Sequence, residues 1–243
     1  MQTAAFRAAG LDEWSYELLD VGPEGLPDAI AKLRAPDAGG ANVTIPYKLA
    51  VMEHLDRLDA DALRAHAVNT ISRDGDLLVG ANTDVSGIRA AMEEVGLDEP
   101  RGAKAIVLGS GGSARAAAVA LEGAHVTFVA RHPEQTGELP GHVAAWFARG
   151  WESEVRDADL LLNATPLGRH EEMPLRPNAL PKAGAVIDLV YVTGGTPLVR
   201  KARSLGLRTA DGWSVLVAQG ARSFEVWTGK PAPVDAMREA LQS

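Results

Sequence analysis

The chain has 243 residues, 46% of them hydrophobic, which suffices for one large domain or two small ones with a buried core. The net charge of −8 argues against non-specific nucleic-acid binding, and no apolar run approaches the ~18 residues that cross a membrane. The chain contains no cysteine and shows no signal-peptide pattern, so we expect no disulfide, no thiolate metal site and a cytoplasmic location.

The first third of the sequence alternates helix and strand patterns. Apolar spacing predicts helices over residues 3–9 and 26–33, and strands over 16–21 and 43–45. Pro46 fits the first turn of a helix that we expect to reach about Leu55, because that turn needs no N–H group from it. Residues 68–72 and 76–81, joined by Asp74-Gly75, predict a β-hairpin, and a helix should follow from about Asp84 to Val95.

From Ala105 onward the pattern becomes that of a parallel α/β sheet. The runs "AIVLG", "HVTFVA", "DLLLNAT" and "AVIDLVY" are almost continuously apolar, which is typical of strands covered on both faces. The stretch "WSVLVAQGARSFEVWTG" predicts an amphipathic helix that ends at Gly229 and Pro231. The predicted fold is therefore α/β, with an N-terminal lobe (1–83, completed by 213–243) and an inserted, doubly wound Rossmann-like lobe (84–212).

A glycine-rich loop, "VLGSGGSARAAAVAL", joins a predicted strand to an alanine-rich helix. Gly109, Gly111 and Gly112 permit a tight turn, and the N–H groups that open the helix suit a pyrophosphate. The spacing is a variant of G-x-G-x-x-G, so an ordinary glycine turn is the alternative. The next strand ends in Ala130-Arg131 rather than in the acidic residue that holds the ribose diol of NAD. A guanidinium suits a 2′-phosphate, so the sequence favours NADP unless Arg131 is only a solvated side chain.

Two polar corners in the first lobe carry side chains suited to acid–base chemistry. Taken alone, Lys48 is equally well interpreted as a surface lysine, and Asp84 is better interpreted as a helix N-cap. Asn69 lies on the partner strand of the predicted hairpin, so four residues are expected to converge at one edge of the lobe: Thr44, Lys48, Asn69 and Asp84. A lysine beside an aspartate forms a pair that moves a proton to or from a substrate hydroxyl.

Over almost the whole chain these motifs resemble the shikimate dehydrogenases of aromatic amino-acid biosynthesis. "NVTIPYK" is similar to the family's N-V-T-x-P-x-K, "GSGGSAR" to its G-A-G-G-A-x-R loop and "NATPLG" to its N-A-T-x-x-G strand end, while "AVNT" and "NTD" match shorter site motifs. The resemblance implies that Lys48 and Asp84 are catalytic and that the substrate is bound by Thr44, Asn69, Tyr191 and Gln219. It implies a cofactor site formed by Gly109, Ser110, Gly111, Gly112, Ser113, Ala130, Arg131, Thr165, Leu189 and Gly212.

The resemblance also implies a reaction, the reversible reduction of 3-dehydroshikimate by NADPH to give shikimate and NADP. The nicotinamide would deliver hydride to the ring ketone while Lys48 supplies the proton to its oxygen, and Asp84 would hold Lys48 and a substrate hydroxyl. Helices that begin near Asp84 and Ser214 would let the lobes close over the substrate. No metal is expected, and the sequence leaves both a monomer and a homodimer open.

The chain departs from the family pattern in several places. Val85 replaces a glycine, Ala130 and His132 replace an asparagine and a threonine or serine, and "PEQTGELPG" breaks a helix that is usual in the family. The family's first strand and its His-Ser-x-Ser-Pro turn do not occur in the chain, so we expect the functional protein to start upstream of Met1.

Three alternatives stay open on the sequence. An NAD-dependent quinate/shikimate dehydrogenase is disfavoured by Arg131, and a two-lobed folate dehydrogenase gives no reason for the Lys48 motif. A non-catalytic NADP-binding relative is disfavoured by the presence of Lys48 and Asp84, although the missing serines favour it.

Overall fold

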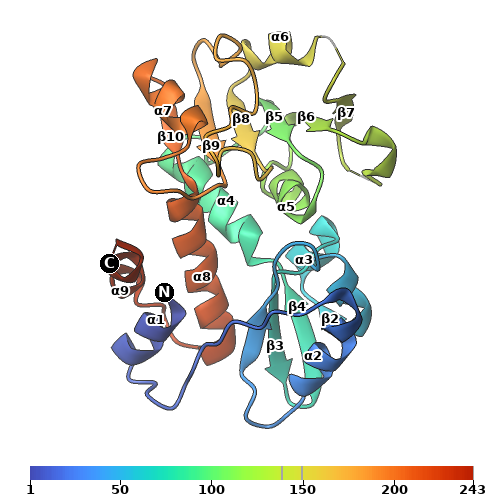
Figure 1. Cartoon of the computed structure of the whole chain (residues 1–243), viewed down its shortest axis with the longest axis vertical. Coiled ribbons are helices and arrows are strands. Elements are labelled where there is room, and N and C mark those ends of the chain that lie inside the picture. The colour runs from blue at the N-terminus through green and yellow to red at the C-terminus, as the bar shows by residue number, and fades with distance from the viewer. Residues whose placement is uncertain (138, 149, 243) are drawn as a thin grey trace. The chain divides into compact units, whose positions relative to one another are not determined.

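The computed structural model describes residues 1–137, 139–148 and 150–242, and its chain forms two compact units (Figure 1). The first unit comprises Met1–Ser86 with Val217–Ser243, and the second comprises Gly87–Leu216. The boundaries fall inside two helices, α4 (Thr83–Glu94) and α8 (Gly212–Thr228). One unit contains a mixed sheet and the other a parallel sheet, each with helices, so the predicted α/β class is confirmed.

The first unit is built on a four-stranded sheet with the order β1-β3-β4-β2. Its strands are β1 (Gly40–Asn42), β2 (Arg57–Leu58), β3 (Thr70–Asp74) and β4 (Leu77–Ala81). The predicted hairpin is confirmed, because β3 and β4 pair antiparallel from Asp74–Leu77 to Thr70–Ala81. Two helices, α2 (Leu26–Lys32) and α3 (Ala60–Ala65), together with the 3₁₀ turns η1 (Pro23–Gly25) and η2 (Ala50–His54), complete this part. The core contains Leu26, Ile30, Val51, Val68, Ile71 and Leu78.

Three predictions in this unit are wrong. Residues 43–45 are not a strand, because β1 ends at Asn42 and the chain then turns, with the Tyr47 N–H donating to the Thr44 carbonyl at 2.9 Å. Residues 46–55 form this turn and η2 rather than an α-helix. Residues 16–21 are extended without a strand partner, and Leu18 is 94% exposed. Alternating apolar residues predict an extended chain, but they do not supply a neighbouring strand.

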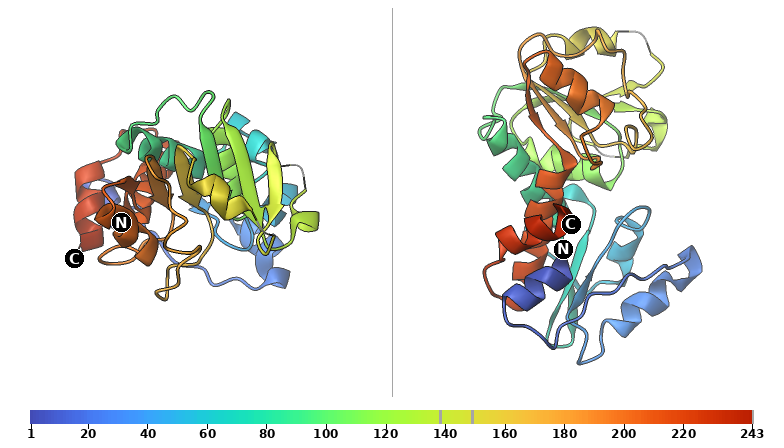
Figure 2. Two further views of the ribbon diagram at one scale, coloured as in Figure 1. Left: turned by 90° about the horizontal axis from the view of Figure 1, so that it is seen from above. Right: turned by 60° about the vertical axis from the view of Figure 1, so that its left-hand side comes forward.

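The termini of the described chain pack on α8. Helix α1 (Gln2–Ala8) lies beside α9 (Val234–Gln242), as Figure 2 shows, and Phe6, Phe224 and Met237 form the buried cluster between the three helices. The Gln2 side-chain amide donates to the Gly220 carbonyl at 2.9 Å. The predicted helix at 3–9 and the long C-terminal helix are confirmed, whereas α9 is not predicted by the sequence; Ser243 lies outside the described residues.

The second unit contains a six-stranded sheet, all parallel, with the order β10-β9-β8-β5-β6-β7. The four apolar runs form four of its strands, as predicted: β5 (Lys104–Leu108), β6 (His125–Ala130), β8 (Leu160–Asn163) and β9 (Ala185–Asp188). The other two strands, β7 (His142–Ala145) and β10 (Arg208–Ala210), are not predicted by the sequence. The helices are α5 (Gly112–Ala120), α6 (Trp151–Val155) and α7 (Pro197–Ser204). After β6 the segment "PEQTGELPG" begins with a 3₁₀ turn, η3 (Pro133–Gln135), and Glu138 lies outside the described residues.

Candidate active site

The backbone of the hairpin holds the loop that carries Lys48. At one end of this loop the Val43 N–H donates to the Asn69 carbonyl at 2.8 Å. At the other end the Lys48 carbonyl accepts the Val68 N–H at 2.7 Å. Asn69 is in turn joined to β4, because its N–H donates to the Ala81 carbonyl at 3.1 Å. Because both ends of the loop are bonded to residues 68–69, Lys48 is held beside Asn69 without any help from its own side chain.

Lys48 and Asp84 form an ion pair. Lys48 Nζ lies 2.5 Å from Asp84 Oδ2, and the two side chains are 11% and 14% exposed. Helix α4 begins at Thr83, so Asp84 lies in its first turn, and the interpretation of Asp84 as the N-cap is wrong. A carboxylate in the first turn of a helix is stabilised by the helix dipole as well as by its cation.

The Asn69 side chain links this pair to α4. Asn69 Oδ1 accepts the backbone N–H of Thr83 at 2.7 Å, and Asn69 Nδ2 donates to Asp84 Oδ1 at 2.8 Å. Reversing the amide would place two donors together at Thr83 and two acceptors together at Asp84, so its orientation is fixed. Gln219 Oε1 lies 3.4 Å from Asn69 Nδ2, which brings α8 to the same group.

A cluster of hydroxyl groups lies behind Asn69. The hydroxyls of Thr70, Thr83 and Ser223 are 2.9 to 3.1 Å apart. Asn42 Nδ2 donates to Ser223 at 3.0 Å, and the Tyr16 hydroxyl donates to Asn42 Oδ1 at 2.9 Å. Burial raises the pKa of Tyr16, which keeps it a donor. The sequence reasoning missed this cluster, although Ser223 lies four residues after Gln219, on the same face of a predicted helix.

Thr44 is placed differently from the other predicted residues of this unit. Its side chain is exposed on the loop between Val43 and Lys48. Within the described part of the chain, the hydrogen-bonded group formed by Lys48, Asn69 and Asp84 does not include it. The predicted role of Thr44 in binding therefore depends on a ligand reaching this exposed loop.

In the second unit the predicted residues lie at the carboxyl ends of the parallel strands. The chain runs from β5 outward to β6 and β7 and then returns to β8 on the other side of β5. In such sheets ligands bind where the strand order reverses, outside the carboxyl ends of the strands. The glycine loop, residues 109–113, follows β5 at this point, and α5 begins within it at Gly112.

The glycine loop is open on one side and tightly packed on the other. Gly111 is the N-cap of α5 without a side-chain cap, and a Cβ added to it would meet no atom within 4 Å. Gly109 has φ +113°, and a Cβ there would lie 3.0 Å from the Ala164 carbonyl oxygen and 3.3 Å from Thr165 Cγ2. The loop therefore packs against Thr165 and leaves open space in front of the helix, which fits a bound phosphate.

The remaining predicted residues lie on both sides of this loop. Ala130 is buried and Arg131 exposed at the end of β6, the strand adjacent to β5. Gly212 lies against the segment after β9, because a Cβ on it would come within 2.7 Å of Leu189 O and Tyr191 N. The Tyr191 ring is 43% exposed and lies 5.2 Å from the Trp213 ring. The second unit thus brings together the glycine loop and Thr165, and separately Leu189, Tyr191 and Gly212.

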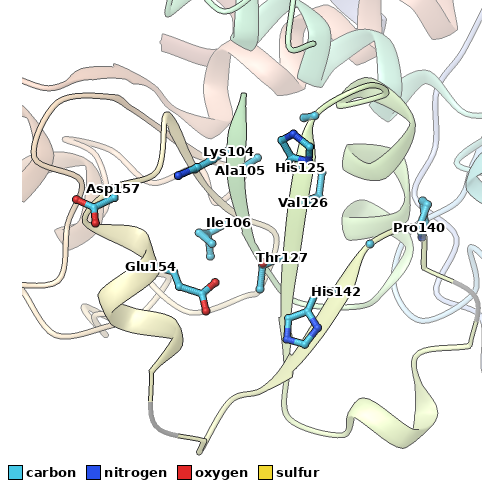
Figure 3. Close-up of a pocket in the computed structure, with 12 residues that line it drawn as sticks. Lys104, Ala105, Ile106, His125, Val126, Thr127, Pro140, His142, Glu154 and Asp157 are labelled. Carbon is cyan, nitrogen blue, oxygen red and sulfur yellow. The ribbon is translucent and has the colours of Figure 1, made fainter. Parts of the chain in front are cut away.

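A hollow of about 580 Å³ lies at the opposite edge of the same sheet (Figure 3). It is surrounded by the amino ends of β5, β6 and β7 and by α6, with Lys104, His125, Thr127, His142, Glu154 and Asp157 in its wall. It is far from the carboxyl ends of the strands, so we do not assign the cofactor to it. Over the described residues, no group of three or more acidic or histidine side chains is placed to hold a metal ion, and no helix is both long and apolar enough for a membrane span.

Comparison with known proteins identifies relatives along the whole chain. Residues 1–71 match the family model of the shikimate dehydrogenase substrate binding domain, and residues 212–242 match that of the shikimate 5′-dehydrogenase C-terminal domain. The chain is 42% identical over 258 residues to the shikimate dehydrogenase (NADP(+)) of Moorella thermoacetica, covering 100% of this chain and 87% of the relative.

Two solved structures extend the comparison to the fold. The shikimate 5-dehydrogenase of Thermus thermophilus, crystallised in complex with NADP(H) and shikimate, is 34% identical with a TM-score of 0.87, over 99% of this chain and 92% of that one. The ligand-free 5-ketofructose reductase of a Gluconobacter species is 33% identical with a TM-score of 0.83, over 99% of this chain and 91% of that one.

Proposed function

The chain belongs to the shikimate dehydrogenase family, and we propose that it reversibly reduces 3-dehydroshikimate to shikimate with NADPH. The observation that carries this proposal is the ion pair of Lys48 and Asp84, 2.5 Å apart and tied to Asn69. A proton donor held by a carboxylate is the arrangement that the reduction of a ketone requires of the protein.

In the proposed reaction the bound cofactor supplies a hydride to the ring ketone. Lys48 Nζ donates a proton to the ketone oxygen as negative charge develops there, and it takes the proton back in the reverse direction. Asp84 Oδ2 holds Nζ by the ion pair, while Asp84 Oδ1 is held by Asn69 Nδ2 at 2.8 Å. Because both oxygens of Asp84 have partners, the proton donor keeps one position, which favours catalysis by orientation.

Four side chains are proposed to bind the substrate. Asn69 is buried beside the ion pair and bonded to Asp84, Thr44 presents an exposed hydroxyl on the loop that leads to Lys48, and Tyr191 presents an exposed phenol from the second unit. The contact of Gln219 Oε1 with Asn69 Nδ2 is long, at 3.4 Å, and therefore weak. We infer that Gln219 exchanges this contact for a substrate hydroxyl.

The residues of the second unit fit NADP. The open space at Gly111 lies at the N-terminus of α5, where Ser110, Gly112 and Ser113 place backbone N–H groups for a pyrophosphate. The exposed guanidinium of Arg131, beside Ala130, suits the 2′-phosphate. We infer that the remaining predicted residues, Thr165, Leu189 and Gly212, hold the nicotinamide half.

We propose that the two units divide these tasks, with residues 1–83 and 213–243 as the substrate-binding lobe and residues 84–212 as the cofactor-binding lobe. A cytoplasmic location is proposed from the absence of cysteine and the use of NADP. The homodimer is a further proposal, which sedimentation of the purified chain would test by its mass.

The test is the initial rate of NADP reduction with shikimate. We expect turnover with NADP and shikimate, much slower turnover with NAD or quinate, and none with the alcohol formed from 5-ketofructose. Turnover with NAD that equals or exceeds that with NADP would favour a quinate/shikimate dehydrogenase. Binding of NADP without turnover of any of these substrates would favour a non-catalytic relative and refute the proposed function.

A further inference from the structure

Asp188 is a completely buried carboxylate at the carboxyl end of β9. Its Oδ1 accepts Asn163 Nδ2 at 2.9 Å and the Val190 N–H at 3.0 Å, and its Oδ2 accepts the Thr196 hydroxyl at 2.6 Å. The three donors come from three different segments of the second unit. Asp188 is therefore the acceptor at which these segments meet.

The first segment is the turn after β8, residues 163–168. Asn163 Nδ2 also donates to the Leu167 carbonyl at 2.9 Å, and Asn163 Oδ1 accepts the Thr165 hydroxyl at 2.7 Å and the Thr165 N–H at 3.1 Å. All the polar atoms of the Asn163 side chain are thus engaged in shaping this turn. Because Asp188 holds Nδ2, it fixes which way the Asn163 amide points, and through it the position of Thr165.

The other two segments follow β9. Val190 lies between Leu189 and Tyr191, against which Gly212 is packed. Thr196 is the N-cap of α7, where its hydroxyl accepts the Val199 N–H at 3.2 Å while donating to Asp188. One carboxylate therefore sets the position of residues 189–191 relative to both the 163–168 turn and α7.

The place of Asp188 in the sheet relates it to one half of the cofactor. Arg131 directly follows β6, on one side of β5, whereas Asn163 and Asp188 end β8 and β9 on the other side. A dinucleotide lies across the point at which the strand order reverses. If its 2′-phosphate is at Arg131, as in the proposed function on which this inference rests, its nicotinamide half is on the side of β8 and β9.

We propose that Asp188 is a positioning residue for the nicotinamide half of the cofactor site, acting through Asn163, Val190 and Thr196. Stability alone does not explain a carboxylate in this place. Burial, with a smaller contribution from the charge of Asp211, raises the pKa of Asp188 to about 6, so the charged form is disfavoured there. An apolar side chain would be easier to bury but would leave all three donors without a partner, whereas an asparagine would still accept from Asn163 and Val190 and would have to donate to Thr196.

The test compares two ligands on the full chain. Calorimetric titration with NADPH and with 2′,5′-ADP, which has the 2′-phosphate but no nicotinamide, would be carried out for the wild type, Asp188→Ala and Asp188→Asn. We expect Asp188→Ala to weaken NADPH by about 10- to 100-fold, because donors to a charged acceptor lose their partner, and to change 2′,5′-ADP less than about two-fold. Asp188→Asn should recover most of the loss, because its oxygen still accepts from Asn163 and Val190 and the Thr196 hydroxyl can accept from its amide.

Asp159→Ala provides a matched control. The Asp159 carboxylate accepts the Lys104 N–H at 2.8 Å at the amino edge of the same sheet, so its loss should change neither affinity. Equal weakening of both ligands by Asp188→Ala, unchanged NADPH affinity, or no recovery in Asp188→Asn would overturn the inference alone. A wild type that binds 2′,5′-ADP no better than 5′-AMP and does not bind NADPH would overturn the proposed function and the inference together.

Discussion

Gly111→Ala separates the effect on folding from the effect on cofactor binding, because no protein atom packs where the alanine Cβ would lie. It has φ −78° and ψ −168°, an extended conformation that alanine adopts without strain, and its Cβ would meet no atom within 4 Å. Replacing glycine by alanine at a compatible site stabilises by about 0.4–1 kcal/mol, whereas alanine is a poorer N-cap by a similar amount. We therefore expect a stability change below about 1 kcal/mol.

The effect of Gly111→Ala on the cofactor should be much larger. The new methyl group would lie in the space in front of α5 that we assign to the pyrophosphate, and it would push the phosphate away from the helical N–H groups. Each hydrogen bond to a charged group contributes about 1.5–3 kcal/mol, so the loss of one weakens NADPH by roughly 10- to 150-fold and the loss of two by roughly 150- to 20,000-fold. Unfolding in urea and titration of NADPH fluorescence measure the two quantities.

Gly22→Ala provides the control for this variant. Gly22 is also an N-cap without a side-chain cap, with φ −70° and ψ 163°, and a Cβ on it would meet no atom within 4 Å. It belongs to the first unit, so its replacement should change neither stability nor NADPH affinity appreciably. Unchanged NADPH affinity in Gly111→Ala would refute the assignment of the pyrophosphate to this loop.

Three further variants test the remaining assignments. Lys48→Ala should lower kcat by about 100-fold or more with a smaller rise in KM, because its proton matters most in the transition state, and an unchanged kcat would remove Lys48 from the mechanism. Arg131→Ala should weaken NADPH by roughly 10- to 150-fold but leave NADH almost unchanged in the same titration, whereas equal losses would make Arg131 structural. Burial raises the pKa of Asp188 from 3.8 to about 6, so the folded protein binds the proton more tightly than the unfolded chain does. This proton binding contributes fully to the free energy of unfolding below about pH 3.8, and the contribution is lost as the pH rises through 6. The melting temperature of Asp188→Asn relative to wild type should therefore increase between about pH 4 and pH 7.5, and a difference independent of pH would contradict this linkage.

The strands of the second unit could be predicted because burial on both faces leaves a signal in the sequence itself. Four almost continuously apolar runs became β5, β6, β8 and β9, and Asp74-Gly75 marked the hairpin turn. Residues 16–21 and 43–45 failed for a common reason, since pairing depends on a partner strand that local pattern does not reveal. Strand β7 carries a mixture of exposed and half-buried residues at the sheet edge, which weakens the apolar signal.

The candidate site, like the fold, could be predicted only in part from the sequence. Sequence motifs indicated Lys48, Asn69 and Asp84, and the structure places them in one hydrogen-bonded group, while their catalytic roles stay predictions. The residues that hydrogen-bond behind this group give no comparable signal in the sequence. Asn42 and Ser223 bond to each other across 181 positions of the chain, and a hydroxyl or amide gives no periodic signal that could relate such distant residues. Thr44, which the motif does indicate, remains exposed and outside this group.

The two carboxylates of the proposed sites illustrate how the surroundings of an aspartate relate to its task. Asp84 is paired with the Lys48 cation, so its charge is compensated and can remain close to a reacting proton. Asp188 is surrounded by neutral donors and fully buried, so its charge is costly, and its value lies in the two oxygens that several segments reach at once. Replacing each by asparagine therefore has opposite expected consequences. Asp84→Asn keeps the shape but removes the charge that holds the proton donor, whereas Asp188→Asn keeps most of the positioning, with its amide donating to Thr196, and removes a charge that is costly to bury.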